Sequence, residues 1–103
     1  MVSRMPPGLW DLVLRRDGQC LPAVFGASGP CSGKMTVDHF WHRPGGVKGK
    51  RAPDDQYHLV ASCWSHNVDH PPSSEVRMKM REYIARYYGL DLEALLRGDY
   101  EVR

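Results

Sequence analysis

The sequence contains few features that would place the protein in a membrane or in a disulfide-stabilised class. No apolar run approaches the roughly 20 residues needed to span a bilayer, which excludes an integral membrane protein. Only three cysteines are present, so a framework made of disulfides alone would leave one thiol over. Nothing near Met1 has the pattern of a signal peptide. We therefore expect an intracellular protein whose cysteines serve another purpose.

The chain is also short of material for a large hydrophobic core. With 103 residues it has room for one small domain. We expect a single domain over 1–103, with its core at about 12–88 and a short acidic C-terminal helix and tail over 89–103. Ten glycines and eight prolines are concentrated in the first three quarters of the chain. Because a core of this size is barely sufficient alone, something besides the core is expected to stabilise the fold.

The net charge is low, at +2, and gives no reason by itself to expect a polyanionic partner. The charge is unevenly placed, however, since 89–103 is acidic and 34–51 carries a single acidic residue, Asp38. The basic residues of that second stretch are Lys34, Arg43, Lys48, Lys50 and Arg51. A local basic patch of this kind suits contacts with phosphate groups, although a merely solvated loop has the same composition.

Apolar and turn-forming residues predict a β hairpin in the middle of the chain. A short helix is predicted over 8–18, followed by a loop over 18–34 that is rich in glycine, serine and proline. β-branched and aromatic residues predict short strands over 35–41 and 57–62. A basic, glycine-punctuated loop over 43–56 separates them. Together the two strands would form a ββ ribbon.

Helical spacing of apolar residues predicts two more helices after a double proline. The first would begin with Ser73 or Ser74 as its N-cap and end at Gly89. The second, over 92–97, would be capped by Asp91. The C-terminal part of the chain is therefore expected to be helical.

The cysteines and one histidine have the spacing of a zinc site. Cys63 and His66 are three residues apart, so a tight turn can present both side chains to one ion. Cys20 and Cys31 bracket a flexible loop that can bring their sulfurs together. Three thiolates and one imidazole complete a tetrahedral structural zinc site with no open position. The alternative is that these cysteines are small buried hydrophobic residues in a reducing cell.

A second group of candidate residues stands at the end of the first predicted strand. Asp38 offers a hard oxygen ligand for Mg²⁺ or Mn²⁺, and the adjacent His39 can deprotonate water. Phosphodiester hydrolysis needs both functions at one site. An Asp-His pair alone is common, and its ordinary interpretation is a surface aspartate beside a packed histidine.

Taken as a whole, the order C…C…VDH…HLV..CWSHN resembles the zinc-containing branch of the HNH endonucleases. These are small nucleases of the ββα-metal, or His-Me finger, class. The chain is also similar to short phage-encoded members, in which RDG-x-C opens the zinc loop and a REY-type helix closes the domain. The resemblance extends from about Leu12 to Tyr88. It implies an α+β fold, a small zinc-stabilised ββα-metal domain with flanking helices.

The resemblance also implies roles for individual residues. Asp38 matches the metal-binding residue of the first motif element, and His39 matches the general base. Asn67, directly after the last zinc ligand, matches the second protein ligand of the catalytic ion. His66 stands where many relatives have the second cysteine of a CxxC pair. His58 stands where most relatives have an asparagine that holds the loop and orients the base, and we include it among the catalytic residues.

Another assignment of the catalytic ligands remains open. His66 and His70 are four residues apart, a spacing that places both rings on one face of a helix. Together with Asp38 they would bind the catalytic ion, as paired histidines do in nuclease bacteriocins. That arrangement would deprive the zinc site of its fourth ligand, and Pro71 disfavours a helix continuing past His70.

The function implied by the resemblance is metal-dependent DNA cleavage. We expect a structural Zn²⁺ ion, a catalytic Mg²⁺ or Mn²⁺ ion that Ni²⁺ can replace, and DNA as partner. Low intrinsic specificity is expected, with targeting supplied by a packaging or other protein partner, and a monomer or a homodimer fits equally well. The expected location is the cytoplasm of a bacterial host, with the chain encoded by a phage or prophage. The expected DNA-binding residues are Arg43, Lys48, Lys50 and Arg51.

Two other functions compete with the nuclease. The first is a non-catalytic zinc module that binds nucleic acid, in which His58 marks decay of the active site. The second is a zinc-stabilised adaptor that binds protein through Tyr83, Tyr87 and Tyr88. Simple packing of Tyr83 and Tyr87 on the hairpin is the alternative to that second function.

Overall fold

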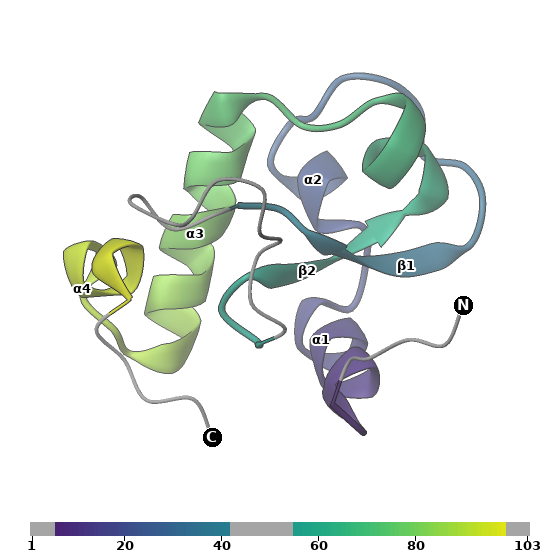
Figure 1. Ribbon diagram of the computed structural model, residues 1–103. Coiled ribbons are helices and arrows are strands. Elements are labelled where there is room, and N and C mark those ends of the chain that lie inside the picture. The colour runs from purple at the N-terminus through teal and green to yellow at the C-terminus, as the bar shows by residue number, and fades with distance from the viewer. Residues whose placement is uncertain (1–5, 42–54, 99–103) are drawn as a thin grey trace, which may run out of the picture.

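The centre of the fold is a two-stranded antiparallel sheet with helices packed against both faces (Figure 1). The computed structural model describes residues 6–41 and 55–98. Within these ranges the α+β class expected from the sequence is confirmed. The elements in chain order are α1 (Leu9–Asp17), α2 (Leu21–Val24), β1 (Met35–His39), β2 (Leu59–Cys63), the π-helical turn η1 (Ser65–Asp69), α3 (Ser74–Tyr88) and α4 (Leu92–Arg97).

Both predicted strands form, with ends that differ slightly from the prediction. Met35 pairs with Cys63 at one end of the sheet, and His39 pairs with Leu59 at the other. β2 begins two residues later than predicted because the Asp55 carboxylate holds the preceding residues in a turn. Its Oδ1 accepts hydrogen bonds from the backbone N–H groups of Tyr57 and His58, at 2.9 and 3.1 Å.

The alternation of side chains along the strands divides the core into two clusters. Residues directly opposite each other in an antiparallel pair share a face, so Asp38 lies on the same face as its partner Val60. That face packs on α3, in a cluster of Leu21, Phe40, Trp41, Tyr57, Val60, Val76, Met80, Ile84, Ala85 and Leu95. The other face packs on α1, in a cluster of Leu9, Val13, Val37 and Leu59. The hairpin is therefore held between α1 and α3.

The last two residues of α1 bind the outer edge of β2. Arg16 Nη2 donates to the Leu59 carbonyl at 2.6 Å, and the Ala61 N–H donates to Asp17 Oδ2 at 2.7 Å. The two side chains also pair with each other, with Arg16 Nε 2.7 Å from Asp17 Oδ1, and both are almost fully buried. A further bond from Arg16 Nη1 reaches the Gln56 carbonyl at 2.6 Å. This Arg16–Asp17 clamp satisfies edge groups that a third strand would otherwise satisfy.

Helix α3 adds two tyrosines to the clamp. The Tyr83 hydroxyl donates to Asp17 Oδ1 at 3.1 Å, and Arg16 Nη1 donates to the Tyr88 hydroxyl at 3.3 Å. Burial, together with the charge of Asp17, raises the pKa of Tyr83 to about 12. Tyr87 is more than half exposed. Of the three tyrosines considered for a protein-binding surface, Tyr83 and Tyr88 are thus engaged inside the fold.

The loop expected over 18–34 contains a short helix, so that prediction was wrong over the four residues of α2. Cys20 is the N-cap of α2, and Pro22 lies in its first turn, where proline is tolerated. Leu21 is buried in the α3-side cluster and fixes the turn against the core. Burial of a single leucine thus outweighs the loop-forming composition around it.

The two C-terminal helices begin and end at the predicted residues. Ser73 is the N-cap of α3, with its hydroxyl accepting from the Val76 N–H at 3.3 Å, and Gly89 ends the helix in a left-handed conformation. Asp91 caps α4 through the Ala94 N–H. Within the described ranges, no helix is long and apolar enough to cross a membrane.

The clamp leads to a first testable expectation. Replacing Asp17 by alanine removes the partner of a buried guanidinium and the acceptor of the Ala61 N–H. We expect the free energy of unfolding to fall by about 3–5 kcal/mol, measured by urea denaturation of the zinc-loaded protein. Asp11→Ala, in the exposed first turn of the same helix, is the control and should lose less than about 1 kcal/mol. Equal effects of the two substitutions would contradict a stabilising clamp.

Candidate functional site

Three cysteine sulfurs and one imidazole nitrogen converge at the end of the hairpin, as the spacing predicted. The ligand atoms of Cys20, Cys31, Cys63 and His66 all lie within 4.8 Å of one another, and the three thiols are free. His66 Nδ1 is 3.5, 3.6 and 3.3 Å from the sulfurs of Cys20, Cys31 and Cys63. Tetrahedral zinc, with Zn–S near 2.3 Å and Zn–N near 2.0 Å, would hold such a nitrogen and sulfur about 3.5 Å apart. The cluster can therefore bind a metal such as zinc.

The surroundings of His66 select the protonation state that a metal needs. Its Nε2 lies 3.1 Å from the Ser28 carbonyl and 3.0 Å from the Gly29 carbonyl. Carbonyl oxygens only accept hydrogen bonds, so Nε2 carries the proton and donates it. The Nδ1 lone pair then faces the sulfurs and is available to an ion. Backbone carbonyls that orient a ligating histidine in this way are typical of metal sites.

Local structure fixes the four ligands from three directions. Cys20 lies at the start of α2, Cys63 ends β2, and His66 follows in η1. Backbone N–H groups point at two of the sulfurs: the Cys63 N–H donates to Cys20 Sγ at 3.4 Å, and the His66 N–H donates to Cys63 Sγ at 3.5 Å. The loop of Cys31 is joined to the turn after β2 by a bond from the Ser65 N–H to the Ser32 carbonyl, at 3.1 Å.

The thiols of the cluster differ in acidity. Burial opposes ionisation of Cys63, but hydrogen bonds from the backbone of His66 and Ser32 outweigh it and lower the pKa of Cys63 to about 6. Desolvation and the neighbouring sulfurs of Cys20 and Cys63 raise the pKa of Cys31 to about 11. At neutral pH Cys63 is therefore a thiolate and Cys31 a thiol. A metal that binds all three as thiolates displaces protons as it binds.

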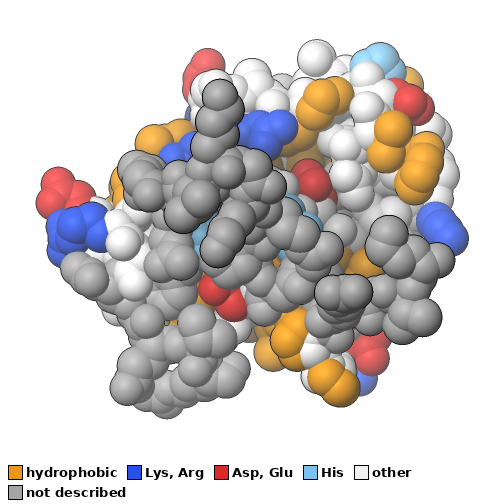
Figure 2. Space-filling view, viewed as in Figure 1, with side chains coloured by type: hydrophobic (Ala, Val, Ile, Leu, Met, Phe, Trp, Pro, Cys, Tyr) orange, Lys and Arg blue, Asp and Glu red, His pale blue; other side chains and the backbone are white. Residues whose placement is uncertain are grey.

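The loop that carries Cys31 lies against Trp64 at Gly33. Gly33 has φ +79°, and a Cβ added there would lie 2.7 Å from Trp64 Cβ. Hydrophobic side chains gather on the surface at this η1 end of the molecule, where Trp64 and Val68 are about half exposed (Figure 2). Because Trp64 is about half exposed and lies against the loop at Gly33, its contribution to the tryptophan fluorescence should change when the loop opens.

Gly33→Ala is expected to weaken the cluster. The left-handed backbone costs about 1–2 kcal/mol with a Cβ, and overpacking against Trp64 adds about 1–3 kcal/mol. Gly26→Ala is the matched control, since Gly26 also has positive φ, +94°, but open space around its Cβ position. Thermal unfolding and zinc titration should therefore show a larger loss for Gly33→Ala. A Gly26→Ala protein that is as unstable would assign the whole effect to the backbone.

Asp38 and His39 lie at the end of β1 farther from the cysteines, and both are partly buried. Burial raises the pKa of the Asp38 carboxyl, and the nearby charges of Arg77 and His39 oppose that rise. A carboxylate in such surroundings gains from a bound cation, because the cation offsets the desolvation of the ionised form.

Asn67 is held against the face of β1 that carries Asp38. Its Nδ2 donates to Thr36 Oγ1 at 2.8 Å, and Thr36 Oγ1 donates to the Ser62 carbonyl at 2.8 Å. Thr36 and Asp38 are two residues apart on one strand and so point to the same face. With its nitrogen used by Thr36, the Asn67 amide oxygen is the atom that remains for a cation.

The structure does not bring His66 and His70 together as a pair of ligands beside Asp38. One ring nitrogen of His66 faces the cysteine sulfurs and the other faces two carbonyls, so neither is available to a second ion. His70 is exposed, and its side chain packs against Gly29, where an added Cβ would lie 2.8 Å from His70 Cγ. His70 lies just past the end of η1 and has a non-helical backbone, with φ −132° and ψ +67°, so helical spacing does not apply to the two histidines.

His58 is fully buried and immediately precedes β2 in the chain. Its Nδ1 donates to Asp55 Oδ1 at 2.8 Å, and its ring stacks on Trp41 with centroids 4.5 Å apart. These contacts fix the start of β2, which pairs with His39 through Leu59. Such a position suits a residue that orients its neighbours. Apart from the three-residue spacing, no sequence pattern predicts the bond between His58 and Asp55.

Two arginines of α3, of which Arg77 acts on the charge of Asp38, were not singled out from the sequence. Arg77 Nη1 donates to the Phe40 carbonyl at 2.6 Å, and Arg81, one turn later on α3, lies over the Trp41 ring at 5.2 Å. Desolvation and the neighbouring Arg77 lower the pKa of Arg81. Like charges one turn apart are an ordinary feature of polar helix faces, which is why the sequence pattern carries no signal here.

The predicted phosphate-binding residues lie outside the described residues. They are Arg43, Lys48, Lys50 and Arg51.

Comparison with known proteins finds no match to a family model, to a curated protein or to a solved structure. The candidate functional features within the described residues are the Cys₃His cluster and the side chains of Asp38, His39 and Asn67.

Proposed function

We propose that the chain is a metal-dependent DNA endonuclease of the HNH, or ββα-metal (His-Me finger), class. The observation that carries the proposal is the bond from Asn67 Nδ2 to Thr36 Oγ1, because Thr36 and Asp38 lie on the same face of β1. An Asp carboxylate and an amide oxygen are ligands that suit Mg²⁺ or Mn²⁺. The Cys₃His cluster immediately before Asn67 would hold a structural zinc ion and fix the turn that presents the amide.

The residues around Asp38 suit hydrolysis of a phosphodiester. A bound divalent ion supplies neutralisation of the charge that develops on the phosphate. His39, adjacent to Asp38, takes the proton from the attacking water as general base. Asp38 and Asn67 hold the ion, and the charge of Arg77 favours a phosphate close to the carboxylate. Arg43, Lys48, Lys50 and Arg51 would contact the DNA backbone, which positions the duplex without reading its sequence.

A non-catalytic zinc module that binds nucleic acid is the second candidate, and the surroundings of His58 favour it. Relatives of the HNH class have asparagine there, whereas His58 is buried, bonded to Asp55 and stacked on Trp41. If His58 orients the general base His39 through these contacts, the orientation of His39 would differ from that of the base in the family pattern. The protein-binding adaptor has less support, because Tyr83 is bonded to Asp17.

Plasmid nicking separates these functions. Zinc-loaded protein is incubated with supercoiled plasmid in the absence of other divalent ions and then with Mg²⁺, Mn²⁺ or Ni²⁺. We expect salt-sensitive DNA binding in every sample and relaxation of the plasmid only where an ion has been added. Omitting the ion, rather than adding EDTA, leaves the zinc in place. DNA binding without nicking under all conditions would identify the non-catalytic module. Absence of DNA binding would exclude both the endonuclease and the non-catalytic module.

A further inference from the structure

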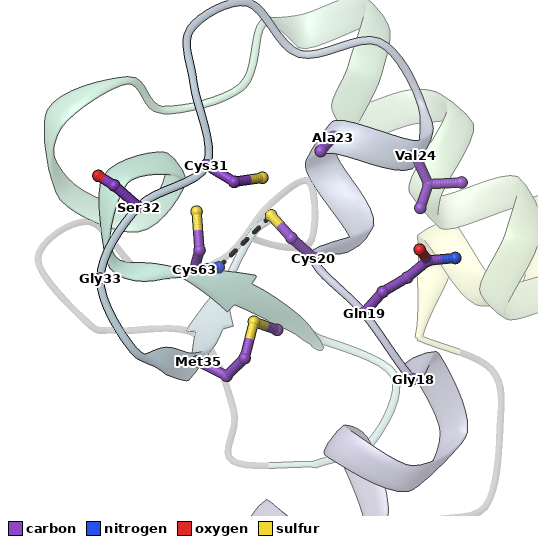
Figure 3. A pocket seen from close by; sticks show the side chains of 10 residues that line it. All are labelled: Gly18, Gln19, Cys20, Ala23, Val24, Cys31, Ser32, Gly33, Met35 and Cys63. Atoms are coloured by element: carbon purple, nitrogen blue, oxygen red, sulfur yellow. Dashed lines mark hydrogen bonds between the residues drawn. The ribbon is translucent and has the colours of Figure 1, made fainter.

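The three cysteine sulfurs border a cavity beside the candidate zinc site (Figure 3). The cavity has a volume of about 600 Å³, and its wall includes Gln19, Ser32 and Met35 as well as the cysteines. Figure 3 shows the side chains of Cys20, Cys31 and Cys63 directed toward one another from α2, the loop and the end of β2. A small molecule in this cavity would lie against the three cysteines without unfolding of the domain.

The sulfurs are not equally protected. Cys20 and Cys63 are 7% and 3% exposed, whereas Cys31 is an exposed residue. Cys20 Sγ accepts the Cys63 N–H, drawn as the dashed line in Figure 3, and Cys63 Sγ accepts the His66 N–H. Over residues 6–41 and 55–98, no backbone N–H donates to Cys31 Sγ. Cys31 therefore lacks both the burial and the amide bond that its neighbours have.

These differences bear on reactivity once a metal has removed the thiol protons. An N–H bond to a thiolate draws electron density from the sulfur and lowers its nucleophilicity, and burial blocks approach of a reagent. We propose that Cys31 is a modification site for small soft electrophiles, with hydroperoxides as the reactant class, and that its oxidation releases the zinc. The inference depends on zinc in the Cys₃His cluster and is independent of nuclease activity.

The oxidation balances in two steps. The Cys31 thiolate attacks one peroxide oxygen, so that an S–O bond forms, the O–O bond breaks and hydroxide leaves, giving a sulfenic acid. A neighbouring thiolate, Cys20 or Cys63, then attacks the Cys31 sulfur; the S–S bond forms and a second hydroxide leaves. Two electrons pass from the two sulfurs to the peroxide, and two protons from solvent convert the hydroxides to water.

The disulfide leaves the ion with one thiolate and one imidazole. Two protein ligands are too few for a structural zinc site, so the ion dissociates. The cavity beside Cys31 would thus make zinc retention, and with it the fold, sensitive to peroxide.

Labelling of the zinc-loaded wild-type protein tests the site directly. The protein is treated with less than one equivalent of N-ethylmaleimide and digested, and the adducts are located by mass spectrometry. We expect Cys31 to be labelled at least about tenfold faster than Cys20 or Cys63. Equal labelling of the three cysteines, or faster labelling of either other one, would overturn the proposal. This measurement needs no substitution and therefore no assumption about folding of a variant.

Zinc release by hydrogen peroxide tests the consequence. A chromogenic chelator follows the released ion in wild-type protein, in Cys31→His, which keeps four ligands, and in Met35→Leu, which removes the other oxidisable sulfur of the cavity. Release should be about tenfold slower in Cys31→His and unchanged in Met35→Leu. Release from Cys31→His at the wild-type rate, or a protein purified without zinc, would refute the inference.

Discussion

His66→Ala protein is expected to be largely unfolded at 25 °C. The substitution removes the nitrogen that lies 3.3–3.6 Å from all three sulfurs, together with the Nε2 bonds to the carbonyls of Ser28 and Gly29. A structural zinc ion contributes on the order of 10 kcal/mol to folding, which is comparable with the whole net stability of a domain. Losing most of that contribution leaves too little to oppose the entropy of the chain.

The reason for so large an effect lies in how the ligands are distributed. Cys20 and Cys31 belong to a segment whose regular structure consists of the single turn of α2. Cys63 and His66 belong to the hairpin and its following turn. The ion would therefore cross-link the segment before β1 to the end of β2.

The measurement is circular dichroism and tryptophan fluorescence of purified protein with its zinc content determined. His66→Cys is the matched variant, because a fourth thiolate still completes a tetrahedral site. We expect His66→Cys to recover most of the zinc and the fold, and chelation of wild-type protein to reproduce the His66→Ala state. A His66→Ala protein that melts like wild type would show that the cluster has no structural function.

His39→Ala is expected to lower the nicking rate by about 10²- to 10⁴-fold, the range attributed to general acid–base catalysis. His39 lies at the end of β1 opposite Leu59, away from the cysteines, so zinc content, thermal stability and DNA binding should be retained. The assay is single-turnover nicking of supercoiled plasmid at saturating Mg²⁺. A loss in rate with unchanged DNA affinity assigns His39 to the chemical step.

His70→Ala is the control for that substitution. His70 is exposed and packs on Gly29, so its removal should leave the nicking rate near that of wild type. A large loss in His70→Ala would restore His70 as the ligand of the catalytic ion in place of Asn67. Wild-type nicking by a folded, zinc-loaded His39→Ala protein would end the nuclease proposal in its present form.

Features governed by neighbours in the sequence were predictable. Ser73 and Asp91 accept N–H groups three residues later, and Gly18 and Gly89 adopt the left-handed conformation that ends a helix. The Cys₃His cluster was predictable for a different reason, because three thiols and an imidazole at such spacings are typical ligands of a single metal ion. Its geometry then followed from a single requirement, convergence on one ion.

Features governed by distant backbone groups were not predictable. Arg16 and Asp17 bind the edge of β2 through the Leu59 carbonyl and the Ala61 N–H, and backbone groups carry no residue identity that a sequence pattern could match. The π-helical turn was equally hidden, because it depends on the position of His66 among the sulfurs. The position of the Asn67 amide is likewise governed by its contact with Thr36, which lies 31 residues away in the chain.

The Arg16–Asp17 clamp and the zinc cluster close almost the same loop. The bond from Ala61 to Asp17 spans 44 residues, and the bond from Cys63 to Cys20 spans 43. Closing a loop of this length costs about 4 kcal/mol of chain entropy, but the cost is incurred once when two cross-links share the loop. Each cross-link therefore forms more readily when the other is present. Affinity for the ion is set in part by Asp17, a carboxylate that is not among its ligands.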